Sequence, residues 1–360
     1  MLFYLSLFLA PAALGLAQAR RPWDVTSAKY HQPSAINVWS AIVVITCIVG
    51  FRFQVGGDWD AYMQTYEAAS RTSPWDLLAI KGPAYQLVNW VSYQLGLGIY
   101  GVNLVCGFIF AFGLMAFCKT LPRPWFALTV STPYLITVVA MGYTRQSVAI
   151  GIIMLASTFL YRNKVVHFAI LILAAATFHK PAILLLGFLI FTLRGTLAFL
   201  TVPAAILLIA TFFFTMSDYF LLTYKNYVIS EYHSSGAVMR TAMTALPATL
   251  FLFFRNRFGM KKSASRFWWA MSLAAITLFV LALISPATTA IDRIALYFLP
   301  IQMLVASYLP DILHLTPQSK RIMKGLVVSG YAGVYLIWLA FADHAYLWVP
   351  YQTIFSEFIC

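Results

Sequence analysis

The sequence predicts an all-α fold, a polytopic membrane helical bundle of about 12 transmembrane helices that forms one integral membrane domain over residues 1–360. Of its residues, 61% are hydrophobic and 10% are charged, whereas about a quarter are charged in a soluble protein. The apolar residues fall in runs near the ~20 residues that span a bilayer. No repeated ten-residue alternation indicates a β-barrel, so helices are the expected spanning element.

The first apolar run, LFYLSLFLAPAALGLAQA, looks like a secretory signal peptide because it ends in Ala17-Gln18-Ala19. It lacks a basic segment in front, and Arg20 and Arg21 follow it. Charges placed after the run favour a retained helix with its N-terminus outside. We therefore expect residues 1–18 to form the first span.

Eleven further runs are predicted as spans, at residues 35–51, 99–118, 124–141, 145–162, 165–178, 181–193, 197–216, 241–255, 266–285, 292–309 and 322–342. The runs at 165–178 and 181–193 are short for a full crossing, which indicates thin, broken or re-entrant segments. The amphipathic stretch 83–97 is expected along the membrane interface. The segments 52–98 and 217–240 are thus predicted as extracytoplasmic loops with interfacial helices.

The formal net charge is +13, but the basic residues lie in short loops and indicate topology rather than a nucleic-acid partner. If the loop 19–34 is cytoplasmic and the sides alternate, the cytoplasmic loops hold 16 of the 24 Lys and Arg residues and two of the 11 acids. This excess predicts that both termini are extracytoplasmic. The four cysteines show neither a zinc-type spacing nor a disulfide framework.

The unusual ionisable residues gather on the predicted outer side, and the first group lies in FRFQVGGDWDAYMQTYE. Gly56 and Gly57 allow a tight turn with positive φ. Asp58 or Asp60 then caps a short helix that buries aromatic residues such as Tyr62. The alternative is a carboxylate held over a polar cavity as a general base or hydroxyl binder.

Two further spans open with polar residues. Arg145 and Gln146 begin the run in TRQSVAIGII, where the arginine either snorkels to lipid headgroups or binds phosphate. His179 and Lys180 precede Pro181 in FHKPAIL. The histidine is either a hydrogen-bonded cap or a general base and phosphate ligand.

The last group lies in DRIALYF. Asp292 and Arg293 form either a cap pair or a second phosphate or sugar contact, and Arg293 shares a helix face with Tyr297. The aromatic loop 217–240 suits a lid over a sugar-like ligand.

The ordered set VGGDWDAY, TRQSVAIGI, FHKPAIL and DRIALYF resembles the EpsG family, which are Wzy-like polymerases of exopolysaccharide and O-antigen repeat units. The resemblance covers about residues 36–310. The positions that carry it are Arg52, Gly57, Asp58, Tyr62, Arg145, Gln146, His179, Arg293 and Tyr297. Pro181 stands where the family often has Ser or Thr, and Gly57 stands where it often has Thr.

The resemblance implies a GT-C-like, lipid-linked glycosyltransferase in the bacterial cytoplasmic (inner) membrane, with its site facing the periplasm or outside. The growing glycan on undecaprenyl diphosphate would be the donor and a newly flipped repeat unit the acceptor. Membrane lipid, a chain-length regulator and a flippase are the further partners it implies.

Residue roles follow from this reaction. Arg52, Arg145 and Arg293 would neutralise the diphosphate leaving group, and Asp58 or His179 would deprotonate the acceptor hydroxyl. The remaining substrate contacts would be Asp60, Tyr62, Gln146, Lys180 and Tyr297. Since arginines do the leaving-group work, the scheme requires no metal and no cofactor.

Three other classes share parts of this pattern. A flippase or transporter also wants an arginine-rich cavity, but it should need charged groups accessible from both sides. A membrane acyltransferase uses a histidine, but its key residues should face the cytoplasm. A ligase that moves finished glycan to another lipid shares nearly all the chemistry and is separated only by the family resemblance.

Overall fold

The computed structural model describes residues 1–18, 33–79, 82–192, 234 and 236–358, and its elements in those ranges are all helical. The all-α prediction is therefore confirmed for the described part of the chain. In order, the helices are α1 (Leu2–Ala17), α2 (Ala35–Gly50), α3 (Trp59–Ser70), α4 (Pro74–Ala79), α5 (Pro83–Gln94), α6 (Gly98–Thr120), α7 (Pro124–Ser131), the π-helical η1 (Thr132–Ala140), α8 (Thr144–Leu160), α9 (Val165–Phe178), the 3₁₀ helix η2 (Lys180–Phe188), α10 (Leu189–Thr192), α13 (Ala237–Phe254), η4 (Arg255–Phe258), α14 (Lys262–Ile284), α15 (Thr288–Ala295), η5 (Leu296–Phe298), α16 (Pro300–Ile312), α17 (Pro317–Phe341), η6 (Ala345–Leu347) and η7 (Ile354–Phe358).

Helices occupy every predicted span except 197–216, which lies outside the described residues. Among the described residues, four helices are long and apolar enough to cross a membrane: α6, the continuous Ala237–Phe258, α14 and α17. A fifth crossing is possible if Thr288–Phe298 and Pro300–Ile312, which meet at a 47° bend, form one span. The other apolar helices have 10–17 residues. A helix of 16 residues is only ~24 Å long against a hydrocarbon core of ~30 Å, so the full count of twelve stays a prediction.

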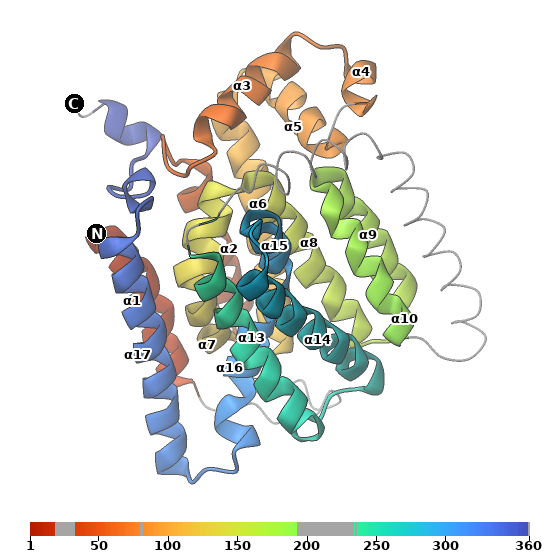
Figure 1. Ribbon diagram of the computed structural model, residues 1–360. Helices are drawn as coiled ribbons and strands as arrows, with labels where there is room; N and C mark the ends of the chain where they lie inside the picture. Colours follow the sequence, from red (N-terminus) through yellow and green to blue (C-terminus); the bar gives the residue numbers. More distant parts are fainter. Residues whose placement is uncertain (19–32, 80–81, 193–233, 235, 359–360) are drawn as a thin grey trace.

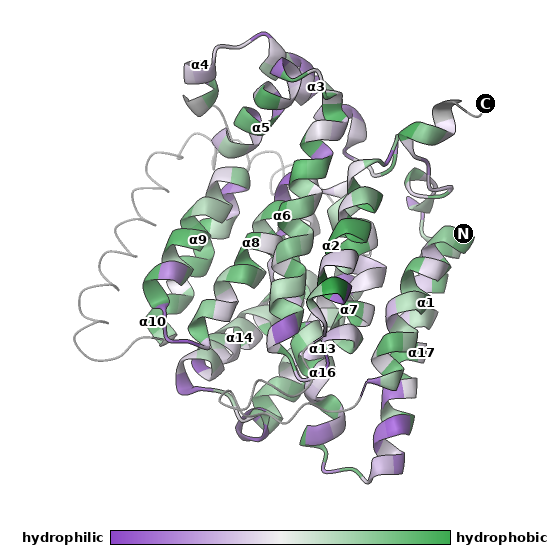
Figure 2. Ribbon diagram, turned by 180° about the vertical axis from the view of Figure 1, so that it is seen from behind, coloured by the Kyte–Doolittle hydropathy of each residue, from purple (hydrophilic) through white to green (hydrophobic). Residues whose placement is uncertain are grey.

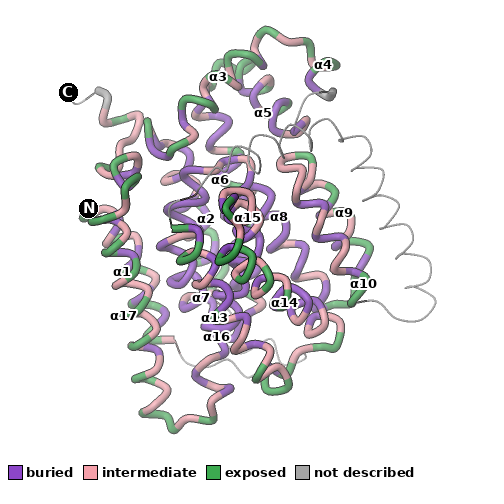
Figure 3. The backbone as a smooth tube through the Cα atoms, in the orientation of Figure 1, coloured by how far each residue is buried: buried purple, intermediate pink, exposed green. Residues whose placement is uncertain are grey.

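The bundle is organised around α6 and α8. Both are mostly apolar and carry glycines where they cross: a Cβ atom on Gly113 would overlap the backbone of Gly151. Small residues allow this approach, and close backbone packing stabilises helix pairs in a membrane. Buried residues concentrate on these central helices, while flanking α1, α17 and α9 retain exposed positions (Figure 3).

The two ends of the bundle are polar and its middle is hydrophobic (Figure 2). At one end lie α3, α4 and α5 (Figure 1), and α5 confirms the predicted helix in 83–97. At the α3–α5 end, the segment after α17 also returns to the bundle. There the Phe53 amide donates to the Gln352 carbonyl at 2.9 Å, and Arg52 forms an antiparallel bridge with Thr353.

At the opposite end, some basic residues do more than mark topology. Arg123 is 3% exposed, and its guanidinium donates to Asp311 Oδ2 at 2.7 Å. Lys320 Nζ contacts the other oxygen of Asp311 at 3.0 Å. Lys324 donates to the backbone carbonyls of Leu16 and Gln18. These bonds tie α1, α7, α16 and α17 together, a role that charge counting could not reveal.

Candidate active site

The loop between α2 and α3 is wedged against the start of α8. Gly56 has a φ of +104°, and a Cβ atom there would lie 2.5 Å from the Met141 carbonyl oxygen. Its amide donates to the Leu347 carbonyl at 2.8 Å. Of the two glycines, only Gly56 has positive φ, whereas a Cβ on Gly57 would meet only Leu347 Cδ1 at 3.5 Å. The predicted glycine turn thus depends on one residue, and the reason is close backbone approach as well as φ.

Arg52 lies beneath this loop and is 1% exposed. One terminal nitrogen donates to the Val49 carbonyl, and the other donates to Asn103 Oδ1 at 3.2 Å and Thr144 Oγ1 at 2.8 Å. Its guanidinium also lies 5.8 Å from the centroid of the Trp59 ring. Arg52 therefore fastens the loop to α6 and α8, and its visible bonds are those of a positioning residue.

Asp58 stands directly before α3 but makes no side-chain capping bond. Instead, its Oδ2 lies 3.9 Å from Arg293 Nη1, and the two side chains are 37% and 35% exposed. Burial raises the pKa of Asp58 above its usual range, while Arg293 and then Arg145 act in the opposite direction. Asp60 is exposed in the first turn of α3, so the two acids have different surroundings.

Arg145 lies in the first turn of α8, and its guanidinium packs against two tyrosine rings. Its Cζ lies 5.9 Å from the Tyr62 ring centroid and 5.8 Å from that of Tyr85. The two rings meet edge to face with centroids 5.7 Å apart. Among the described residues Arg145 forms no ion pair. Aromatic faces hold a cation without neutralising it, so its charge stays available for an anion.

Arg293 reaches the same place from α15. Its Cζ lies 3.9 Å from the Tyr143 ring centroid. Gln146 Nε2 donates to the Arg293 carbonyl at 2.6 Å. Gln146, which was predicted as a substrate contact, therefore anchors α15 to α8.

The predicted Asp292–Arg293 cap pair is wrong. Both carboxylate oxygens of Asp292 accept from Arg240 of α13, each at 2.8 Å. Ser234 Oγ adds a third bond at 3.0 Å. Because neighbouring helical residues point in different directions, Asp292 faces α13 while Arg293 faces Asp58.

His179 lies in the break between α9 and η2, and its Nδ1 contacts the hydroxyl of Tyr297 in η5. Burial, and then the positive charges of Arg145 and Arg293, lower the pKa of His179 well below its usual range. The imidazole is therefore neutral at pH 7. Lys180, the first residue of η2, is half-buried.

The structure thus gathers Asp58, Arg145, Arg293, His179 and Tyr297 from four separate parts of the chain at the α3–α5 end of the bundle. Arg52 and Gln146 support this cluster from below, and Asp60 stands apart in solvent. Within the described ranges, no group of three or more His, Cys, Asp or Glu side chains could hold a metal ion. The cluster can bind an anion, hold a neutral imidazole and present a carboxylate.

The motifs did not identify several residues of the site. The ring partners Tyr85 and Tyr143 and the Arg52 partners Asn103 and Thr144 were missed. Tyr143 and Thr144 directly precede Arg145, so an aromatic and a hydroxyl next to a span-opening arginine were the available signal. Of the predicted lid 217–240, residues 217–233 and 235 lie outside the described residues, and Arg240 pairs with Asp292.

The model of the EpsG family matches residues 37–353. No curated protein and no solved structure matches the chain.

Proposed function

We propose that this chain, which belongs to the EpsG family, joins oligosaccharide repeat units carried on undecaprenyl diphosphate and releases undecaprenyl diphosphate. Family membership and the apolar helices make it a multi-pass membrane protein of the exopolysaccharide polymerase type. The substrate, the extracytoplasmic location of the reaction and a GT-C-like architecture are our proposals, as is the orientation with both termini outside.

The observation that carries the proposal is the pair of arginines around Asp58 and His179. The positive charges of Arg145 and Arg293 lower the pKa of both Asp58 and His179. The Arg145 guanidinium packs against the Tyr62 and Tyr85 rings, and the Arg293 guanidinium lies over the Tyr143 ring and 3.9 Å from the partly exposed carboxylate of Asp58. Guanidinium groups bind phosphate oxygens through paired hydrogen bonds. Two such groups would stabilise the negative charge that develops on a departing diphosphate.

Asp58 is the better candidate for the general base. A histidine whose pKa is far below 7 accepts a proton poorly, whereas a carboxylate whose pKa is raised moves toward the range in which a base is effective. In this scheme Asp58 takes the proton from the acceptor hydroxyl as its oxygen bonds to the anomeric carbon. The bond from that carbon to the diphosphate breaks, and the electron pair leaves with the diphosphate.

The other side chains have supporting roles. His179 and Tyr297 together offer a neutral hydrogen-bonding pair for a sugar or diphosphate oxygen. Gln146 positions Arg293, and Arg52 positions the loop that carries Asp58. Tyr62 steadies Arg145, and Lys180 and Asp60 remain proposed contacts for the outer parts of the substrate.

The test is Arg145→Ala in a strain that lacks the wild-type gene, followed by a gel of lipid-linked glycans and an immunoblot of membranes. We expect normal protein levels, one repeat unit on its lipid carrier, and a fall in chain lengthening of about 10²–10³-fold, the usual cost of losing one transition-state donor. Arg71→Ala is the matched control because Arg71 is an exposed arginine at the end of α3.

Other outcomes would overturn the assignment. Normal chain length in Arg145→Ala would exclude its role. If loss of the gene leaves long polymer on its lipid carrier, the protein is a ligase or modifying enzyme. Repeat units trapped on the cytoplasmic leaflet would instead identify a flippase.

A further inference from the structure

An apolar cavity of about 380 Å³ adjoins the His179–Tyr297 contact. Its walls are η2, the second half of α14, and the α15–η5 turn. Most lining side chains are aliphatic or aromatic, including Leu184, Phe188 and Leu278. Among the described lining residues, only Thr277 and Tyr297 carry hydroxyls, and that of Tyr297 contacts His179.

Two of these walls begin at residues of the candidate active site. Pro181 lines the cavity and follows His179 by two residues. Ile294 lines it and follows Arg293, whose guanidinium faces Asp58. Tyr297 belongs to both the cavity and the site. The cavity therefore continues directly from the charged cluster into apolar surroundings.

We propose that this cavity holds the first part of the polyprenyl chain of the lipid-linked substrate, while Arg293 and Arg145 hold its diphosphate. The proposal rests on the proposed function, and it adds where the lipid lies. The arrangement matches the chemistry of such a lipid, in which a doubly phosphorylated head is followed at once by branched hydrocarbon.

The size of the cavity agrees with this occupant. The lining residues of η2 run from Pro181 to Phe188, which at ~2 Å per residue in a 3₁₀ helix is ~14 Å. This is about half of the ~30 Å hydrocarbon core. A chain lying along η2 would therefore remain within one leaflet, as required for a lipid whose headgroup is at the α3–α5 end.

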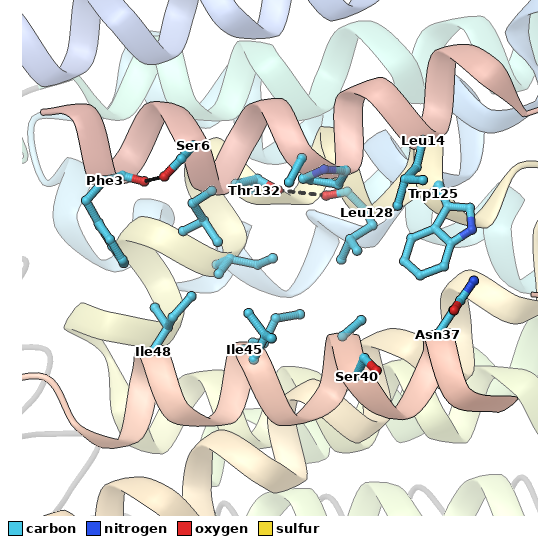
Figure 4. Close-up of a pocket in the computed structure, with 16 residues that line it drawn as sticks. Phe3, Ser6, Leu14, Asn37, Ser40, Ile45, Ile48, Trp125, Leu128 and Thr132 are labelled. Carbon is cyan, nitrogen blue, oxygen red and sulfur yellow. Dashed lines mark hydrogen bonds between the residues drawn. The ribbon is translucent and has the colours of Figure 1, made fainter. Parts of the chain in front are cut away.

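A second apolar groove provides a contrast. It has a volume of about 510 Å³ and lies between α1, α2 and the α7–η1 segment (Figure 4). None of the described residues that line it is charged. The Ser6 hydroxyl donates to the Phe3 carbonyl within α1 at 2.8 Å, and the Thr132 hydroxyl donates to the Leu128 carbonyl in the preceding α7 at 3.0 Å. The groove is larger, but its described polar lining consists of neutral side chains such as Asn37 and Ser40, which bind a diphosphate less strongly than arginines do. Size alone therefore does not select the polyprenyl site.

The polyprenyl chain gains little free energy from the hydrophobic effect when it enters the cavity, because the bilayer that it leaves is itself apolar. Shape and van der Waals packing must therefore supply the selectivity of the cavity for the polyprenyl chain. A side chain that fills the cavity should remove this selectivity. Thr277 is suitable for this because it lines the cavity and is exposed, so a larger side chain there can enter the cavity without displacing the core of α14.

The test uses the full-length protein in nanodiscs of phosphatidylglycerol and phosphatidylethanolamine, with undecaprenyl diphosphate added and the bound lipid measured by native mass spectrometry. We compare wild type with Thr277→Trp. Val280→Trp is the matched control because Val280 is exposed on the same helix outside the cavity. Ala41→Trp fills the other groove. We expect Thr277→Trp alone to reduce bound undecaprenyl diphosphate, by about tenfold, which corresponds to about 1.4 kcal/mol.

The outcomes separate the two proposals. If the wild-type protein holds undecaprenyl diphosphate and Thr277→Trp holds as much, the cavity proposal is overturned and the proposed function stands. The same conclusion follows if Ala41→Trp gives the loss, or if Thr277→Trp releases phosphatidylglycerol equally. If the wild type holds no more undecaprenyl diphosphate than Arg145→Ala, the substrate itself is wrong and both proposals fail.

Discussion

Gly56 offers a sharp test of how the loop geometry supports the reaction, because its neighbour Gly57 is a built-in control. In Gly56→Ala the new Cβ would lie 2.5 Å from the Met141 carbonyl oxygen, whereas ordinary contact begins at 3.4 Å. The loop must therefore shift by about 0.9 Å, the difference between these distances. The positive φ adds about 1–3 kcal/mol of backbone strain for a non-glycine residue.

Asp58 follows Gly56 by two residues, so the shift moves the proposed base. A misplacement of about 1 Å can reduce a rate about 10²-fold. We expect Gly56→Ala to lose chain lengthening by about that factor, while Gly57→Ala, whose Cβ meets only Leu347 Cδ1 at 3.5 Å, stays near wild type. The assay is the gel of lipid-linked glycans, normalised to the amount of protein in the membrane by immunoblot.

The result that refutes this reasoning is specific. Full chain lengthening by Gly56→Ala would show that the loop adapts or that Asp58 does not act on the substrate. Equal losses in both alanine variants would show that general flexibility matters, rather than the close approach to Met141.

Three further predictions follow from the same site. Asp58→Asn should abolish chain lengthening yet be more heat-stable than wild type at neutral pH. Burial raises the pKa of Asp58 in the folded protein, so its ionised form destabilises the fold as pH rises through and above the usual carboxyl range. Equal melting temperatures of the two proteins at pH 7 would contradict this. Arg52→Met should lower the free energy of unfolding by about 2–4 kcal/mol, because it leaves Asn103 Oδ1 and Thr144 Oγ1 without the guanidinium donor, whereas thermal melting of Arg145→Met should match wild type. Tyr297→Phe should keep the fold and reduce chain lengthening about threefold to tenfold, the effect of one lost hydrogen bond; activity at the wild-type level would exclude the contact with His179 from the reaction.

The sequence alone determined the class of protein and the candidate site residues. Hydropathy is a local property, so a helix occupies each predicted apolar run that the structure describes. The motifs around Asp58, Arg145, His179 and Arg293 were recognisable because ionisable residues at the ends of apolar runs are costly without a function. The order of these motifs also indicated the EpsG family, which the family comparison confirms.

The tertiary structure decided how these residues pair. Asp292 adjoins Arg293 in the chain but binds Arg240, and Arg293 instead faces Asp58. Arg52 is a buried anchor, whereas Arg145 keeps its charge between aromatic rings. Such distinctions depend on which helix faces meet, and that is set by packing among segments far apart in the sequence. The cavity beside Tyr297 has the same origin, since α14, α15 and η2 enclose it only after the bundle has formed.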